Sequence, residues 1–148
     1  MILYIIKGIL FSSLLLFAAV CDLRNREIPN SISLGMLAVG MIGITPLSFL
    51  YSLLGLIIAA LPYFAVDIVS KRNRFPIGGG DIKLMAGCGF VLGVGGGILQ
   101  NLIALPIAII YGMVITVIEK IKFNEESIPL APFICVGGML VYFRSVFL

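Results

Sequence analysis

Long runs of apolar residues, separated by short polar or Gly/Pro-containing breaks, make up most of this chain. A run of about 20 apolar residues is long enough to cross a bilayer as a helix. The pattern predicts six such helices, at about residues 2–21, 31–44, 49–70, 81–99, 102–118 and 129–147. We therefore expect an all-α membrane protein, a bundle of about six transmembrane helices that forms a single domain over residues 1–148.

The separation of the second and third helices depends on a break at Thr45-Pro46-Leu47-Ser48. Without this break, residues 32–69 would form one helix of about 57 Å at about 1.5 Å per residue. That length is nearly twice the thickness of the hydrocarbon core. Proline removes a backbone donor and clashes with the preceding turn, so we expect two helices here, the first of them short.

The charged residues predict how the bundle is oriented. Only 11% of residues are charged, whereas a soluble domain carries about a quarter. Six spans place eight of the ten basic residues in or beside three loops on one side, which the positive-inside rule makes cytoplasmic. These residues are Arg24, Arg26, Lys71, Arg72, Arg74, Lys83, Lys120 and Lys122. Both termini then face outward, and the net charge of +3 is explained by contact with membrane lipids rather than nucleic acid.

Several kinds of chemistry are excluded by composition. The chain has no histidine, which rules out a Ser-His-Asp triad, a Cys-His pair and a His-Glu-x-x-His zinc site. Its three cysteines (Cys21, Cys88 and Cys135) are far apart, so we expect neither a disulfide framework nor a zinc site, and we predict no metal and no cofactor. Basic residues directly after the first apolar run favour a retained helix over a cleaved signal peptide.

Three of the seven acidic residues lie at predicted helix ends, where an ionisable group is costly or functional. Asp22 ends the first helix, where the negative end of the helix dipole gives a carboxylate no capping role. Its position is consistent both with a role in a functional site and with contact with lipid headgroups. Asp81 begins the fourth helix, where aspartate is also a favoured N-cap. Asp67 is most simply paired with Lys71, four residues later on the same helix face.

The predicted topology brings Asp22 and Asp81 to the same membrane face. Two neighbouring carboxyl groups share one proton, so one can activate water while the other polarises a peptide carbonyl. From the helix dipoles we expect Asp81 to be the base and Asp22 the acid. Gly78, Gly79 and Gly80 precede Asp81; lacking a Cβ, they permit positive φ and let a substrate backbone come close.

Three segments resemble motifs of the type IV prepilin peptidases and preflagellin peptidases. The segment around Asp81 is similar to their Gly-x-Gly-Asp-x-Lys-Leu-x-Ala motif; it reads Gly78-Gly79-Gly80-Asp81-Ile82-Lys83-Leu84-Met85-Ala86. The segment Asp22 to Asn30, which ends in Ile28-Pro29-Asn30, resembles the segment of their first aspartate. Pro129-Leu130-Ala131-Pro132-Phe133 is similar to the stretch that opens their last helix.

This resemblance implies a six-span aspartic endopeptidase at the cytoplasmic face of the inner membrane. It would remove the short leader of prepilin-like or archaellin-like proteins, whose leader precedes a hydrophobic helix, in type IV pilus assembly or protein secretion. Asp22 and Asp81 take the catalytic positions, and Gly78, Gly79, Gly80, Lys83, Pro29 and Asn30 the supporting ones. Lys83 would hold Asp81 ionised or orient its loop.

Long members of the family also carry a cysteine-rich N-terminal domain and methylate the new N-terminus. We expect neither that domain nor methyltransferase activity here, as in the short members. Three alternatives stay open: another Gly-x-Gly-Asp intramembrane protease, a non-catalytic membrane component of a pilus assembly, and a small transporter with a proton relay. The position of the acids at one face disfavours the transporter.

Overall fold

The protein is helical over the part of the chain that the computed structural model describes, residues 2–73, 78–119 and 129–147. The helices are α1 (Ile2–Asn25), α2 (Asn30–Met41), α3 (Pro46–Asn73), α4 (Gly79–Glu119) and α5 (Ala131–Phe147), with no β-strand within these residues. Three of them, α1, α3 and α4, are long and apolar enough to cross a membrane. Most of their outward side chains are large and apolar, as lipid contact requires. The predicted all-α membrane fold is confirmed.

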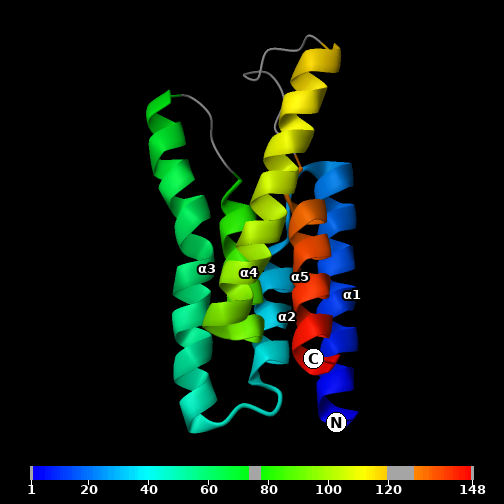
Figure 1. Cartoon of the computed structure of the whole chain (residues 1–148), viewed down its shortest axis with the longest axis vertical. Helices are drawn as coiled ribbons and strands as arrows, with labels where there is room; N and C mark the ends of the chain where they lie inside the picture. Colours follow the sequence, from blue (N-terminus) through cyan, green and yellow to red (C-terminus); the bar gives the residue numbers. More distant parts are fainter. Residues whose placement is uncertain (1, 74–77, 120–128, 148) are drawn as a thin grey trace.

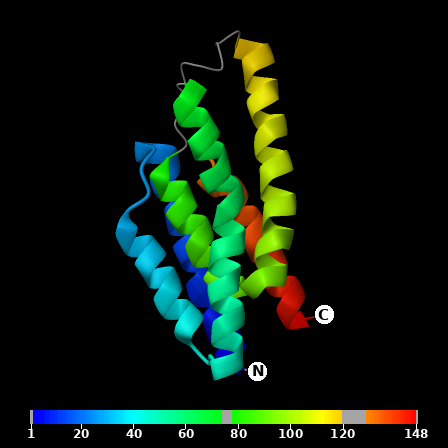
Figure 2. The same cartoon turned by 90° about the vertical axis from the view of Figure 1, so that its left-hand side faces the viewer.

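Helix α4 is a hairpin of two arms rather than one rod. Its backbone is non-helical at Gly93, where φ is 70° and ψ is −174°. Figures 1 and 2 show the two arms, residues 79–92 and 94–119, running side by side in opposite directions. The described helices therefore provide six helical segments.

The turn inside α4 was predicted between residues 99 and 102, and this position is wrong. Gly93 takes the turn because its φ/ψ combination is accessible essentially to glycine alone. The polar residues Gln100 and Asn101 lie inside the second arm instead, buried in the bundle. The Gln100 side-chain amide donates to the Ile134 carbonyl at 2.9 Å, and that of Asn101 donates to the Ala59 carbonyl at 3.0 Å.

The break between the second and third helices is confirmed. Helix α2 ends at Met41, Gly43 turns the chain with a φ of 69°, and Pro46 is the first residue of α3. Proline suits this position because the first helical N–H has no partner within the helix. With 12 residues, α2 is about 18 Å long, shorter than the hydrocarbon core.

The ends of the helices divide the bundle into two poles. Figure 1 places both chain termini at one pole, and it places the end of α1 and the start of α4 at the other, which we call the site pole. The first arm of α4 begins below the outer ends of α3 and of the second arm, so its first turn is recessed (Figure 1). At the opposite pole, the Lys7 ammonium donates to the Gly40 and Ile42 carbonyls at 3.1 and 3.4 Å, closing the end of α2.

Small residues let α3 lie directly against the α4 hairpin. A Cβ on Gly55 would overlap the carbonyl oxygen of Gly89, and a Cβ on Gly97 would lie 3.0 Å from that of Ala59. Gly89 and Gly97 thus serve helix packing, and Gly93 forms the turn midway between them. This close packing fixes the first arm of α4, which carries Asp81.

Candidate active site

Asp22 lies in the last turn of α1 and is buried, with 6% of its surface exposed. Its Oδ2 accepts a hydrogen bond of 2.9 Å from the backbone N–H of Ala131, the first residue of α5. The carboxyl group therefore faces the positive end of the α5 dipole as well as the negative end of its own helix. The sequence argument had included only the second of these two influences.

Asp81 lies in the first turn of α4 and is 8% exposed. Its backbone N–H donates to the Gly78 carbonyl at 3.0 Å, which fixes the turn that leads into the helix. Its Oδ1 is buried and makes no hydrogen bond in the described structure. The Asp81 carboxyl interacts electrostatically with that of Asp22, so the structure brings the two predicted acids together at the site pole.

The segment between α1 and α2 packs against the start of α4. The Lys83 ammonium donates to the Asn30 side-chain oxygen at 2.9 Å, across 53 residues of sequence. A Cβ added to Gly80 would lie 3.1 Å from the Cβ of Ile28. Pro29 precedes α2, and its carbonyl accepts the N–H of Ile32 at 3.0 Å. The first two motif segments thus meet at one place, and Lys83 holds the loop.

The three glycines before Asp81 differ in their surroundings. Among the described glycines, Gly43 and Gly93 have positive φ, so the freedom that glycine permits is used at those two positions. Gly80 makes a close contact with Ile28, which leaves little room for a side chain. A Cβ on Gly79 would have no neighbour within 4 Å among the described residues, and one on Gly78 would lie 3.2 Å from Asp81 Oδ2.

Tyr63 is a buried neighbour of Asp81 that the sequence did not reveal. It lies on α3 and is fully buried, with 1% exposed, and its hydroxyl interacts electrostatically with the carboxyl of Asp81. A tyrosine in an apolar run gives no signal, although it lies one turn before Asp67 on the same helix face. Asp67 is also buried and makes a contact of its own. Its predicted partner Lys71 lies outside the described side chains, so that pairing stays a prediction.

Ionisable and sulfur-containing groups outside the carboxyl pair offer little further chemistry. Within the described residues, no three His, Cys, Asp or Glu side chains cluster as ligands of a metal ion. The three cysteines are free thiols, and the Cys88 thiol contacts the Met36 sulfur at 3.6 Å in the core. Among the described side chains, the buried carboxyl and phenol groups of this half of the bundle are Asp22, Asp81, Tyr63 and Asp67.

Comparison with known proteins finds relatives among the leader peptidases. The model of the type IV leader peptidase family matches residues 9–118. A prepilin leader peptidase/N-methyltransferase of Bacillus subtilis (strain 168) is 33% identical over 138 residues, which cover 91% of this chain and 54% of the relative. One from Legionella pneumophila is 31% identical over 130 residues, 82% of this chain and 44% of the relative. The chain thus spans about half the length of these relatives. No solved structure gives a significant match.

Proposed function

This chain belongs to the type IV leader peptidase family, and we propose that it removes leader peptides from prepilin-like proteins by aspartic catalysis, with Asp22 and Asp81 as the reacting pair. The family supports a role in leader processing. The aspartic mechanism is our own inference. It rests on one observation, that two buried carboxyl groups from distant parts of the chain interact at the site pole.

The surroundings of the two carboxyl groups favour different protonation states. Asp22 accepts a backbone N–H at the start of α5, an arrangement that stabilises a carboxylate. The buried Oδ1 of Asp81 has no such donor, so this carboxyl group is better suited to carry the shared proton. We propose that Asp22 activates the water and Asp81 polarises the peptide carbonyl. This assignment reverses the one suggested by the helix dipoles alone.

The substrate would approach along the start of α4. A Cβ on Gly78 would lie 3.2 Å from Asp81 Oδ2, and one on Gly79 would meet no described atom within 4 Å, so there is open space close to this carboxyl group. An extended peptide could lie there with its backbone close to the acid, because no Cβ intervenes. The prepilin's hydrophobic helix would remain in the bilayer while the leader extends beyond the site pole. We place this pole at the cytoplasmic face because most basic residues of the sequence flank it.

Methyl transfer is a separate question, since the two relatives are named as methyltransferases as well as peptidases. Our prediction is peptidase activity without methylation. Mass spectrometry of the mature prepilin tests it, because a methylated N-terminus adds the mass of one methyl group. A methylated product formed by the purified protein with a methyl donor would contradict it.

The decisive experiment is cleavage of a prepilin co-expressed with Asp22→Asn or Asp81→Asn. Each change is nearly isosteric and removes one carboxyl group. We expect each to lower the cleavage rate by about 10⁴-fold or more, as with other residues that act as a catalytic unit. Glu27→Gln is the matched control, because it makes the same chemical change at an exposed acid five residues after Asp22.

The result is read as mature and precursor bands on a gel, with membrane insertion checked for each variant. Cleavage at the wild-type rate in either aspartate variant would exclude the paired mechanism. Absence of cleavage by the wild type with every prepilin offered would favour a non-catalytic component of a pilus assembly.

A further inference from the structure

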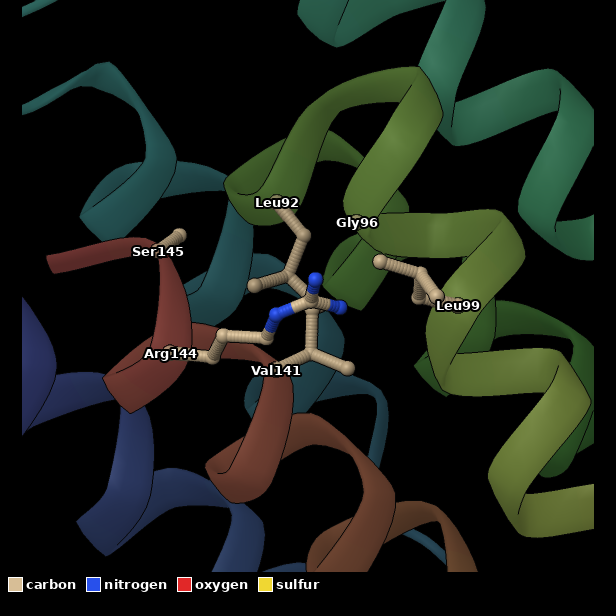
Figure 3. Close-up of a pocket in the computed structure, with 6 residues that line it drawn as sticks. All are labelled: Leu92, Gly96, Leu99, Val141, Arg144 and Ser145. Atoms are coloured by element: carbon tan, nitrogen blue, oxygen red, sulfur yellow. The ribbon is translucent and has the colours of Figure 1, made fainter. Parts of the chain in front are cut away.

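A groove lies at the pole opposite to the aspartates, between the α4 hairpin and the end of α5. Its volume is about 360 Å³, near the lower limit for a site that holds a small molecule. It is lined by Leu92, Gly96, Leu99, Val141, Arg144 and Ser145, which we call the Arg144 groove (Figure 3).

The apolar wall of this groove depends on Gly96. A Cβ there would lie 2.7 Å from the Cβ of Leu92 and 3.5 Å from a methyl group of Val141, so a larger residue would close the space. Leu99 is partly exposed beside it, with 37% of its surface accessible. The Ser145 hydroxyl donates to the Tyr142 carbonyl at 2.7 Å and is thus already used. Arg144 is the lining residue with charge to offer a ligand.

The guanidinium of Arg144 reaches over Val141 into the space between Leu92 and Leu99 (Figure 3). The structure describes the side chains of four acids: Asp22, Glu27, Asp67 and Asp81. They lie towards the other pole, on α1, the loop after it, late α3 and the start of α4. No described carboxylate is therefore available to Arg144. The other cation of this pole, Lys7, is already bonded to the carbonyls at the end of α2.

The Arg144 side chain is exposed, and its guanidinium lies beside apolar groups at a membrane boundary, where an anion that brings its own apolar part can neutralise the charge. The guanidinium fork matches a phosphate with two parallel hydrogen bonds. We propose that the Arg144 groove binds the phosphate of an anionic phospholipid, with part of an acyl chain against Leu92, Leu99 and Val141. The lipid would belong to the leaflet opposite to the proposed active site.

The test is native mass spectrometry of the purified protein released from micelles that contain equal amounts of phosphatidylglycerol and phosphatidylcholine. We expect the wild type to retain phosphatidylglycerol about tenfold more often, a preference that Arg144→Gln abolishes. Arg144→Lys should keep part of it, because the ammonium retains the charge but not the fork. Arg24→Gln is the matched control: it removes one charge from an exposed arginine at the site pole.

Three outcomes would overturn the proposal. The first is an Arg144→Gln protein that retains phosphatidylglycerol as well as Arg24→Gln does, with both showing wild-type circular dichroism. The second is equal retention of the two lipids by the wild type. The third is displacement of the lipid by inorganic phosphate at the same concentration, which would indicate a site for free anions rather than for a lipid.

Discussion

Replacing Gly80 by alanine perturbs the position of Asp81 without touching either carboxyl group. The added Cβ would lie 3.1 Å from the Cβ of Ile28, whereas carbon atoms prefer about 3.5–4.0 Å. The start of α4 and the loop before α2 must therefore separate by about 0.4 Å or more. The Lys83–Asn30 hydrogen bond of 2.9 Å joins the same two segments and resists that movement.

The expected effect on activity follows from this displacement. A misplacement of about 1 Å can cost about 100-fold in rate, so a shift of about 0.4 Å should lower kcat/KM by about tenfold. The overpacking itself should cost about 1–3 kcal/mol of stability, partly offset because alanine favours helix over glycine. Gly95→Ala is the matched control, because it makes the same substitution in α4 at an exposed glycine away from the site, where no described atom lies within 4 Å of the added Cβ.

The assay measures kcat/KM for prepilin cleavage by purified enzyme in detergent micelles, alongside the thermal unfolding of each variant. The double variant Gly80→Ala with Ile28→Gly removes the contact and should regain most of the lost activity. Equal activity of Gly80→Ala and Gly95→Ala would refute the reasoning. So would a loss in Gly80→Ala that Ile28→Gly does not relieve.

Three further predictions concern the turn, the proton and the loop. Gly93→Ala should lower the free energy of unfolding by about 1–3 kcal/mol, because the φ of 70° at this position strains an alanine. Gly95→Ala is the control, since this glycine lies in open space at ordinary φ and its replacement should leave the free energy of unfolding unchanged. Thermal unfolding of the two variants compares them. The pH profile of kcat should be bell-shaped, since activity is lost at low pH when both carboxyl groups are protonated and at high pH when both are ionised; a flat profile between pH values on the order of 4 and 9 contradicts a shared proton. Lys83→Met removes the hydrogen bond to Asn30, so it should loosen the loop before α2 and lower kcat/KM by about tenfold. If this hydrogen bond is responsible, Asn30→Ala should lower kcat/KM equally, and the double variant should show no further loss.

The number of helical segments, and their ends outside the α4 hairpin to within a few residues, could be predicted from sequence because apolar length and basic loops are local signals. The break before Pro46 was predicted for the same reason. The turn in α4 was misplaced because Gln100 and Asn101 look like loop residues when their partners are unknown. Their amides are satisfied by the carbonyls of Ile134 and Ala59, in other helices. No local pattern distinguishes that outcome from a polar turn.

The meeting of the two candidate acids, Asp22 and Asp81, at one pole could be predicted because each stands in a motif at a helix end and the topology places both ends at the same side. Their surroundings could not. The N–H that reaches Asp22 comes from Ala131, 109 residues later in the chain, and the tyrosine beside Asp81 comes from the middle of α3. Such contacts depend on how the helices are rotated against one another. The proton assignment changed for this reason.

The hydrogen bond between Asp22 and Ala131 has a consequence for biogenesis. It joins α1 to α5, so Asp22 lacks its donor until a helix that begins 109 residues later in the chain has been synthesised and has docked. Until then, the Asp22 carboxyl group lies in an environment unlike its final one. The proposed chemistry therefore requires α5 to be in place before the nascent chain can hydrolyse a peptide.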